Sequence, residues 1–598
     1  MNPTPPTLDL GALSRAYKNG TLTPPALIES LLERARSFEQ HNIWIHLATA
    51  QELAPYLDRL TDHSPEDLPL YGVPFAVKDN IDVAGMPTTA GCEAYRYRPT
   101  EHAAVVQALV DAGAIPIGKT NLDQFATGLV GTRSPEPWGP CRNSVNPDYI
   151  SGGSSAGSAV AVALGLASFS LGTDTAGSGR VPAAFNNLIG LKPTLGRVSV
   201  RGVVPACQTL DCVSLFARDA QQAHDILAVM EKPDPQDPWQ RSAPTGAKPI
   251  PANFRFGVPQ RGQLDFDGDK NSEQLFDQAI DHLTSLGGEA VELDFAPFLE
   301  AAKLLYEGPW VAERYLATSP LISEQPDALL PVTRSIIEKG AEGTARDAFA
   351  AQYRLKALKA RADQNWSRLD VIVTPTTPTI YTIEQLNAEP VTLNSNLGTY
   401  TNFMNLLDYS AVAVPGGWLD TGLPGGCTLF APAFQDEQLL ALASRLQPLG
   451  SQTVGALEDP VTASEFAAKE RTIDVLVCGA HLSGLPLNHQ LTSRKAALVE
   501  TTHSADCYRM YLLAGGPPFR PGMIRDPGQG VALPVEIWRV PADQFGSFVA
   551  GIPAPLGIGQ VELEDGRWVA GFICEPVGLE GAREITDLGG WRNYVAQA

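Results

Sequence analysis

The chain has 598 residues, 44% of them hydrophobic, and a formal net charge of −22 from 44 basic and 66 acidic residues. This length exceeds what one hydrophobic core ordinarily organises, so we expect two or more domains. A strongly acidic protein repels nucleic acid and anionic membranes, which excludes both as main partners and favours an enzyme acting on a small molecule. If that molecule is an anion, a local arginine must hold it.

The N-terminal residues lack a basic segment followed by an apolar one, so we expect no signal peptide and a cytoplasmic protein. Eight cysteines are scattered without a CxxC pair, which favours reduced thiols over a zinc site or disulfides, and we expect neither metal nor cofactor. The longest apolar run, residues 156–171, is shorter than the ~20 residues of a membrane span and predicts a buried core helix.

Helical and strand patterns alternate along the first part of the chain. Residues 9–42 predict two helices, and residues 72–77 predict an apolar strand that ends at Lys78. Residues 103–112 predict a helix and residues 114–118 a strand. This β-α-β alternation predicts an α/β fold, in which helices cover both faces of a large mixed sheet.

The later elements follow the same alternation with one surface interruption. They are two short strands within residues 196–215, a polar excursion at 231–253, a turn and helix at 264–276, a helix at 306–317, a strand at 369–380 and a closing segment at 402–415. Residues 264–276 mimic a calcium loop, but Gly268 stands at its fourth position rather than its sixth and Phe276 at its twelfth. We therefore predict no calcium site there.

Residues 151–194 are rich in Gly, Ser and Ala and nearly free of charge. Two turns, GGSSAGS at 152–158 and GTDTAGSGR at 172–180, bracket a run of small apolar residues. Glycines let such turns point bare N–H groups into a cavity, and small side chains let a helix approach neighbouring backbone closely. The stretch predicts a nucleophilic hydroxyl beside an anion-binding hole.

The G-x-S-x-G match at residues 153–157 leaves one alternative open, an α/β-hydrolase with Ser155 as its nucleophile. Its histidine candidates, His224 and His282, lie in apparent amphipathic helices, where a solvated or packed histidine is usual. A phosphate-binding loop is excluded because no GxxxxGK[ST] occurs.

A second interpretation uses both turns and a lysine. The pattern VKDN at Lys78, GGSS at Ser154, and TDTAGSGR with Ser178 placed 24 residues after Ser154 strongly resembles the amidase signature family of amide hydrolases. The resemblance implies that Ser178 is the nucleophile, that Ser154 bridges it to Lys78 and follows a cis peptide bond, and that Lys78 is the base. A buried lysine has a lowered pKa, so it can take the proton of a serine hydroxyl.

The same resemblance implies an oxyanion hole built from successive backbone N–H groups. These belong to Thr175, Ala176, Gly177 and Ser178. We expect Asp174 and Arg180, which flank this loop, to form a structural ion pair. Gly128 and Arg133 lie on a turn-rich loop that leads into the Gly/Ser centre, and we expect both to contact the substrate.

The C-terminal part has a different texture. Residues 1–447 predict the amidase-signature catalytic domain, residues 448–470 a linker ending in a helix, and residues 471–598 a small, mostly β domain with short strands and Gly/Pro turns. No internal repeat occurs.

Finer features resemble one branch of the family, the allophanate hydrolases. They are Ala176 where many relatives have Gly, the YEGPWVAERY segment, and a C-terminal domain that opens with CGAHLSGLPLN. The resemblance implies a small anionic substrate, allophanate, whose carboxylate Tyr306 and Arg314 hold. It also implies a homodimer and a decarboxylation of the product assisted by His481, and it leaves an association with upstream pathway enzymes open.

Two alternatives remain at this point. A general amidase or an amidotransferase component of the same family would share the serines and the lysine but would need neither Arg314 nor the C-terminal domain. That domain would then be a docking or oligomerisation module.

Overall fold

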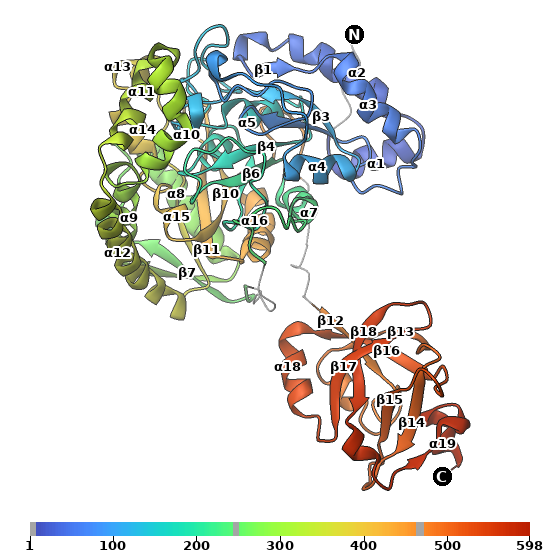
Figure 1. Ribbon diagram of the computed structural model, residues 1–598. Coiled ribbons are helices and arrows are strands. Elements are labelled where there is room, and N and C mark those ends of the chain that lie inside the picture. Colours follow the sequence, from blue (N-terminus) through green and yellow to red (C-terminus); the bar gives the residue numbers. More distant parts are fainter. Residues whose placement is uncertain (1–7, 243–249, 462–471, 598) are drawn as a thin grey trace. The chain divides into compact units, whose positions relative to one another are not determined.

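The computed structural model describes residues 8–242, 250–461 and 472–597. Within these residues the chain forms two compact units (Figure 1). Unit 1 holds the described residues up to 461, and unit 2 holds those from 472 onward.

Unit 1 is built on an eleven-stranded sheet formed by the described residues. In spatial order its strands are β1 (Trp44–Leu47), β3 (Ile115–Thr120), β2 (Pro74–Lys78), β4 (Phe169–Asp174), β6 (Cys212–Ala217), β5 (Ile189–Lys192), β10 (Tyr409–Trp418), β11 (Pro424–Pro432), β9 (Val371–Pro375), β7 (Phe254–Pro259) and β8 (Gly288–Leu293). β2 pairs in parallel with β3 and β4, and β7 with β8 and β9, whereas the other pairs are antiparallel. The sheet is therefore mixed, as predicted.

Helices surround this sheet in Figure 1. They are α1 (Leu10–Lys18), α2 (Pro24–Arg36), α3 (Ala50–Leu60), α4 (Ala104–Asp111), α5 (Ala156–Ala163), α6 (Val181–Phe185), α7 (Ala220–Met230), α8 (Lys270–Ser285), α9 (Ala296–Glu307), α10 (Val311–Glu324), α11 (Pro331–Ile337), α12 (Ala345–Ala362), α13 (Ile383–Ala388), α14 (Thr392–Leu397), α15 (Phe403–Leu406) and α16 (Asp436–Gly450). Every residue of β2, β3, β4, β5, β6 and β9 is buried. Burial at successive positions of a strand means that both faces of the sheet are covered.

The N-terminal elements confirm the sequence predictions. Thr23 caps α2 by accepting a hydrogen bond from the N–H of Ala26, and two prolines occupy the first turn, where a helix needs no donor. β2 ends at Lys78, and α4 and β3 follow. α8 begins at Lys270 after a turn, as predicted for that segment.

The small residues of α5 allow close packing, as the sequence indicated. A Cβ on Gly157 would lie 2.3 Å from the carbonyl oxygen of Ile43. The prediction of one helix over residues 156–171 is wrong, however. α5 stops at Ala163, Gly165 adopts a left-handed φ of 65°, and the apolar run continues as β4. A short apolar run fits a buried strand and a buried helix equally well.

Two other predicted elements differ. Two short strands were predicted within 196–215, but residues 196–211 contain none, and only β6, which begins at Cys212 and ends at Ala217, falls partly in this range. The predicted helix over 306–317 is two helices, because α9 ends at Glu307 and α10 starts at Val311. Pro309 lies between them, and a proline inside a helix removes a backbone donor and clashes with the preceding turn.

Unit 2 contains a five-stranded sheet in the order β13, β16, β12, β18, β17 and a three-stranded sheet in the order β15, β14, β19. Its elements are β12 (Thr472–Val477), α17 (His489–Thr492), β13 (Ala497–His503), β14 (Tyr508–Leu512), β15 (Pro521–Arg525), β16 (Pro534–Pro541), α18 (Ala542–Ala550), β17 (Leu556–Glu562), β18 (Trp568–Cys574), β19 (Arg583–Glu584) and α19 (Trp591–Gln597). Its own apolar cluster includes Leu476, Trp538 and Phe572. This agrees with the small, mostly β domain expected there.

The segment predicted as a linker begins inside unit 1. α16 extends to Gly450, Val454 is buried against α5 and α6, and Asp459 pairs with Arg218 at 2.6 Å. The helix expected at the end of this segment falls at residues 462–471, outside the described residues. The exact domain limits stay predictions.

None of the helices in the described part of the chain has the length and apolarity that a membrane crossing requires.

Candidate active site

Lys78 lies at the carboxyl end of β2 and is completely buried. Its Nζ donates to Ser154 Oγ at 2.8 Å and to Thr173 Oγ1 at 2.7 Å. The peptide bond between Gly153 and Ser154 is cis, as the resemblance implied. The structure thus joins two of the three predicted catalytic side chains directly.

Burial lowers the pKa of Lys78 to about 7, because the protein interior disfavours the ammonium form. The carboxylates of Asp123, Asp211 and Asp174 act in the opposite direction, and the guanidinium of Arg314 adds to the lowering. A lysine with this pKa is partly neutral at neutral pH. It can therefore accept a proton, which a charged lysine cannot do.

Ser178 lies on the turn that joins β4 to α6 and is 3% exposed. Its hydroxyl makes no hydrogen bond with the residues that the structure describes. Of the four predicted oxyanion donors, Gly177 uses its N–H to bind Asp174 Oδ1 at 2.8 Å. This removes Gly177 from the donor set in this structure, so Thr175, Ala176 and Ser178 are the candidates that remain.

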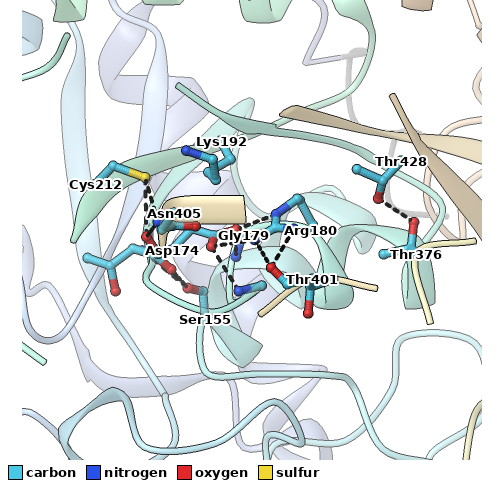
Figure 2. A network of polar contacts seen from close by, with 12 residues as sticks. Ser155, Asp174, Gly179, Arg180, Lys192, Cys212, Thr376, Thr401, Asn405 and Thr428 are labelled. Carbon is cyan, nitrogen blue, oxygen red and sulfur yellow. Dashed lines mark hydrogen bonds and ion pairs between the residues drawn. The ribbon is translucent and has the colours of Figure 1, made fainter. Parts of the chain in front are cut away.

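Asp174 and Arg180 form the structural ion pair expected from the sequence (Figure 2). Arg180 donates to both carboxylate oxygens at 2.9 Å, and both side chains are fully buried. Asp174 also accepts the N–H of Gly179, and Asn405 donates to its carbonyl oxygen. These contacts fix the turn that carries Ser178 from both ends.

Asp123 is a buried residue of the site that was not predicted from the sequence. Its backbone N–H donates to the carbonyl of Ser154, and its carboxylate accepts the N–H groups of Val130, Gly131 and Arg133 at 2.8 to 3.1 Å. Asp123 therefore ties the loop at residues 128–133 to the serine that contacts Lys78. A carboxylate within a Gly-rich loop gave no sequence signal, because its partners are backbone groups.

Gly128 and Arg133 have structural contacts in this loop. A Cβ on Gly128 would lie 2.6 Å from Asp123 Oδ2, so only glycine fits there. The guanidinium of Arg133 donates to the carbonyls of Thr127 and Pro390 at 2.9 and 2.7 Å. Both residues thus shape the loop, and their predicted contact with substrate stays a prediction.

Arg314 on α10 is 2% exposed. One of its Nη atoms donates to the carbonyl of Ala126 and to Thr127 Oγ1, and its guanidinium carbon lies 5.6 Å from the ring centre of Tyr306 on α9. It forms no ion pair with the described residues. The helix break at Pro309 has not separated Tyr306 from Arg314, although one helix was predicted to carry both.

Asp211 is a second buried carboxylate that was not predicted from the sequence. It accepts hydrogen bonds from the hydroxyl of Thr175 and from the N–H groups of Ala206 and Cys207. Burial raises its pKa, while these hydrogen bonds and the charge of Arg314 oppose the rise. Asp211 thereby anchors the first of the candidate oxyanion donors.

The structure disfavours the α/β-hydrolase alternative. The hydroxyl of Ser155 donates to the carbonyl of Thr173 and accepts its N–H, at 3.1 and 3.2 Å. A hydroxyl held on both sides by a strand backbone is not available as a nucleophile.

No group of three or more histidine, cysteine or acidic side chains in the described residues is arranged to hold a metal ion.

His481 lies in unit 2, and its site is described by itself. Its Nε2 lies 3.0 Å from Gln490 Oε1, and its ring stacks on Phe572 with centres 5.0 Å apart. Burial lowers the pKa of this imidazole, which favours its neutral form.

Comparisons with known proteins assign both units. Residues 26–440 match the Amidase family model, and residues 473–596 match that of the allophanate hydrolase C-terminal domain. The structure of Kluyveromyces lactis allophanate hydrolase is 42% identical with a TM-score of 0.77, covering 99% of each chain.

Curated relatives extend the comparison. Urea amidolyase of Saccharomyces cerevisiae is 43% identical over 590 residues, which is 95% of this chain and 32% of that protein, so the chain spans about a third of that relative. A glutamyl-tRNA(Gln) amidotransferase component of Deinococcus radiodurans is 32% identical over 73% of this chain and 96% of its own length. The chain is an amide hydrolase that belongs to the amidase family and carries an allophanate hydrolase C-terminal domain.

Proposed function

We propose that unit 1 hydrolyses allophanate, urea-1-carboxylate, to ammonia and N-carboxycarbamate, and that unit 2 assists the loss of carbon dioxide from this product. The observation that carries the proposal is Arg314. It is a buried guanidinium without an ion-pair partner among the described residues, and its charge acts on both Lys78 and Asp211. A buried arginine in that state is suited to a substrate carboxylate.

In the proposed first step, Ser178 Oγ attacks the terminal carbonyl carbon of allophanate. The hydroxyl proton passes through Ser154 to the neutral amine of Lys78, along the 2.8 Å contact between those two side chains. The C–N bond then breaks, and the relay returns the proton to the leaving nitrogen, which departs as ammonia. Water hydrolyses the acyl-serine and releases N-carboxycarbamate.

The negative charge that develops on the carbonyl oxygen needs donors. We assign this role to the backbone N–H groups of Thr175, Ala176 and Ser178, since the N–H of Gly177 is engaged by Asp174. Removing one such donor from an oxyanion hole typically costs about 3 kcal/mol of transition-state stabilisation. Thr175 is held in place by Asp211, which supports its assignment.

In the proposed second step, His481 assists decarboxylation within unit 2. Carbon dioxide leaves with cleavage of its bond to nitrogen, and that nitrogen gains a proton. A neutral imidazole held by Gln490 can exchange protons at neutral pH, which supports the assignment.

The relatives favour this substrate over the alternative of a general amidase. The amidotransferase component matches 73% of this chain, whereas the allophanate hydrolase of Kluyveromyces lactis matches 99% of it, including unit 2.

Following the resemblance, we also propose a homodimer in the cytoplasm. The cysteines in the described residues are all unpaired, which supports a reducing compartment.

The proposal is tested by ammonia release from allophanate, malonamate and a longer uncharged amide. We expect Ser178→Ala to abolish turnover and Arg314→Ala to raise KM for the two anionic substrates mainly, with less effect on the uncharged amide. Preference of the unaltered enzyme for the uncharged amide, with no effect of Arg314→Ala, would retain the serine mechanism and reject allophanate.

A deletion distinguishes the two roles of unit 2. A chain that ends at residue 470 keeps every residue assigned to the first step. Ammonia release that continues while carbon dioxide release is delayed supports catalysis by unit 2. Loss of the dimer with unchanged timing of both products supports a docking module.

A further inference from the structure

Unit 2 contains a cavity of about 130 Å³ beside His481. The polar side chains that line it are His481, Gln490 and Arg520, and its apolar walls include Pro518, Ile552 and Phe572. No aspartate or glutamate among the described residues lines it. The cavity therefore offers one permanent positive charge and no negative one.

Arg520 is the unusual member of this set. Its Nε atom is buried without a hydrogen-bond partner, and the side chain makes no hydrogen bond or ion pair with the residues that the structure describes. A guanidinium has five N–H donors, and leaving a buried donor unpaired is unfavourable. An incoming acceptor would satisfy these donors.

Other arginines of unit 2 lack this feature. Arg509 pairs with Glu584 and Asp526, and Arg539 pairs with Asp474. Arg494 donates to Ser547 and to the carbonyl of Gln490. Arg520 therefore differs from these three arginines, because its guanidinium donors remain available to a ligand.

The geometry around His481 favours a ligand between the two side chains. The imidazole is fixed by its stacking on Phe572 and by Gln490. The positive charge of Arg520 acts on this imidazole and, by lowering its pKa, helps to keep it neutral. A neutral ring and a charged guanidinium thus line one small cavity, which suits a planar anion more than a bulky or cationic ligand.

We propose that Arg520 is the anion-binding residue of this cavity, where it holds a carboxylate of a small planar carbamate or dicarboxylate next to His481. The inference deepens the proposed function, because N-carboxycarbamate has this chemistry, but binding by Arg520 depends on the cavity alone. Its test is therefore separate from the test of the reaction in unit 1.

The test uses calorimetric titration of the full chain with malonate, a stable small dicarboxylate. We expect two binding events, one lost in Arg314→Gln and the other weakened by about tenfold or more in Arg520→Gln. Arg539→Gln, at an arginine of unit 2 that does not line the cavity, serves as the matched control and should leave both events unchanged. Malonate binding that Arg520→Gln leaves unchanged, whether the unaltered chain shows one event or two, would overturn the proposal.

A second variant guards against loss of folding. Arg520→Lys keeps the charge and should retain weaker malonate binding, with the thermal transition of unit 2 unchanged. If both Arg520 variants fold and bind malonate as the unaltered chain does, Arg520 is not the anion-binding residue. If the proposed reaction of unit 1 is wrong, this would appear in the ammonia release of the Arg314 and Ser178 variants, and not in the malonate binding of the Arg520 variants.

Timing of the products gives a further readout. With allophanate as substrate, Arg520→Gln should leave the first ammonia release unchanged and lengthen the lag before carbon dioxide appears. An unchanged lag in a variant that has lost malonate binding would contradict a role for this anion site in the second step.

Discussion

The activity of unit 1 should follow the protonation of Lys78. Only the neutral amine accepts the proton of the serine relay, so activity is lost as the pH falls through the pKa of Lys78. That pKa is about 7, lowered mainly by burial. Between pH 8 and pH 6 the neutral fraction falls from about nine tenths to about one tenth, so kcat/KM should fall about tenfold.

Two substitutions should move this acid limb in opposite directions. Arg314→Gln removes a positive charge that lowers the pKa of Lys78, so the limb should move to higher pH. Asp123→Asn removes the carboxylate that opposes the lowering most, so the limb should move to lower pH. Arg314→Lys is the matched control, since it keeps the charge and should raise KM without moving the limb.

Malonamate suits the assay because its carboxylate, with an ordinary pKa of about 4, stays ionised over the pH range of the measurement. Ammonia release is measured from about pH 5.5 to 9 under kcat/KM conditions. A flat profile between pH 6 and 8, or a shift in the same direction for Arg314→Gln and Asp123→Asn, would refute the assignment of Lys78 as the base.

Two stability and activity predictions concern the turn that carries Ser178. Arg180→Ala leaves Asp174 charged and fully buried without its partner, so unit 1 should lose about 3–5 kcal/mol of stability. A thermal transition of unit 1 within about 1 °C of the original would contradict this. Gly177→Ala places a Cβ 2.5 Å from Thr401 Oγ1 at a φ of 133°, so kcat should fall sharply while the thermal transition of unit 2 stays unchanged. Unaltered kcat in that variant would show that the turn can adjust.

The parts of the site that depend on local pattern could be predicted from the sequence. Lys78 ends an apolar strand, and Ser154 and Ser178 lie in glycine-rich turns with a fixed spacing, and the resemblance of these three segments to the amidase signature family implied that they share one site. Asp123 and Asp211 could not be predicted, because each binds backbone or hydroxyl groups that only the folded chain brings near. Their surroundings in the sequence are those of ordinary loop aspartates.

Helix and strand boundaries failed where two structures share one pattern. Residues 156–171 are apolar throughout, and the turn at Gly165 decides that α5 ends and β4 follows. Apolar and polar residues alternate within 196–211 enough to suggest a strand, yet this segment packs as a loop. In both cases tertiary contacts, which a single sequence does not display, select the conformation.

We predict that Arg314 links substrate binding to the strength of the base. In the free enzyme its charge lowers the pKa of Lys78. A bound carboxylate would neutralise much of that charge, so the pKa of Lys78 should be higher in the enzyme–substrate complex than in the free enzyme. Because kcat reports the complex and kcat/KM the free enzyme, the acid limb of kcat for malonamate should lie at higher pH than that of kcat/KM. An uncharged amide should show a smaller separation, and equal separations for both substrates would disprove the link.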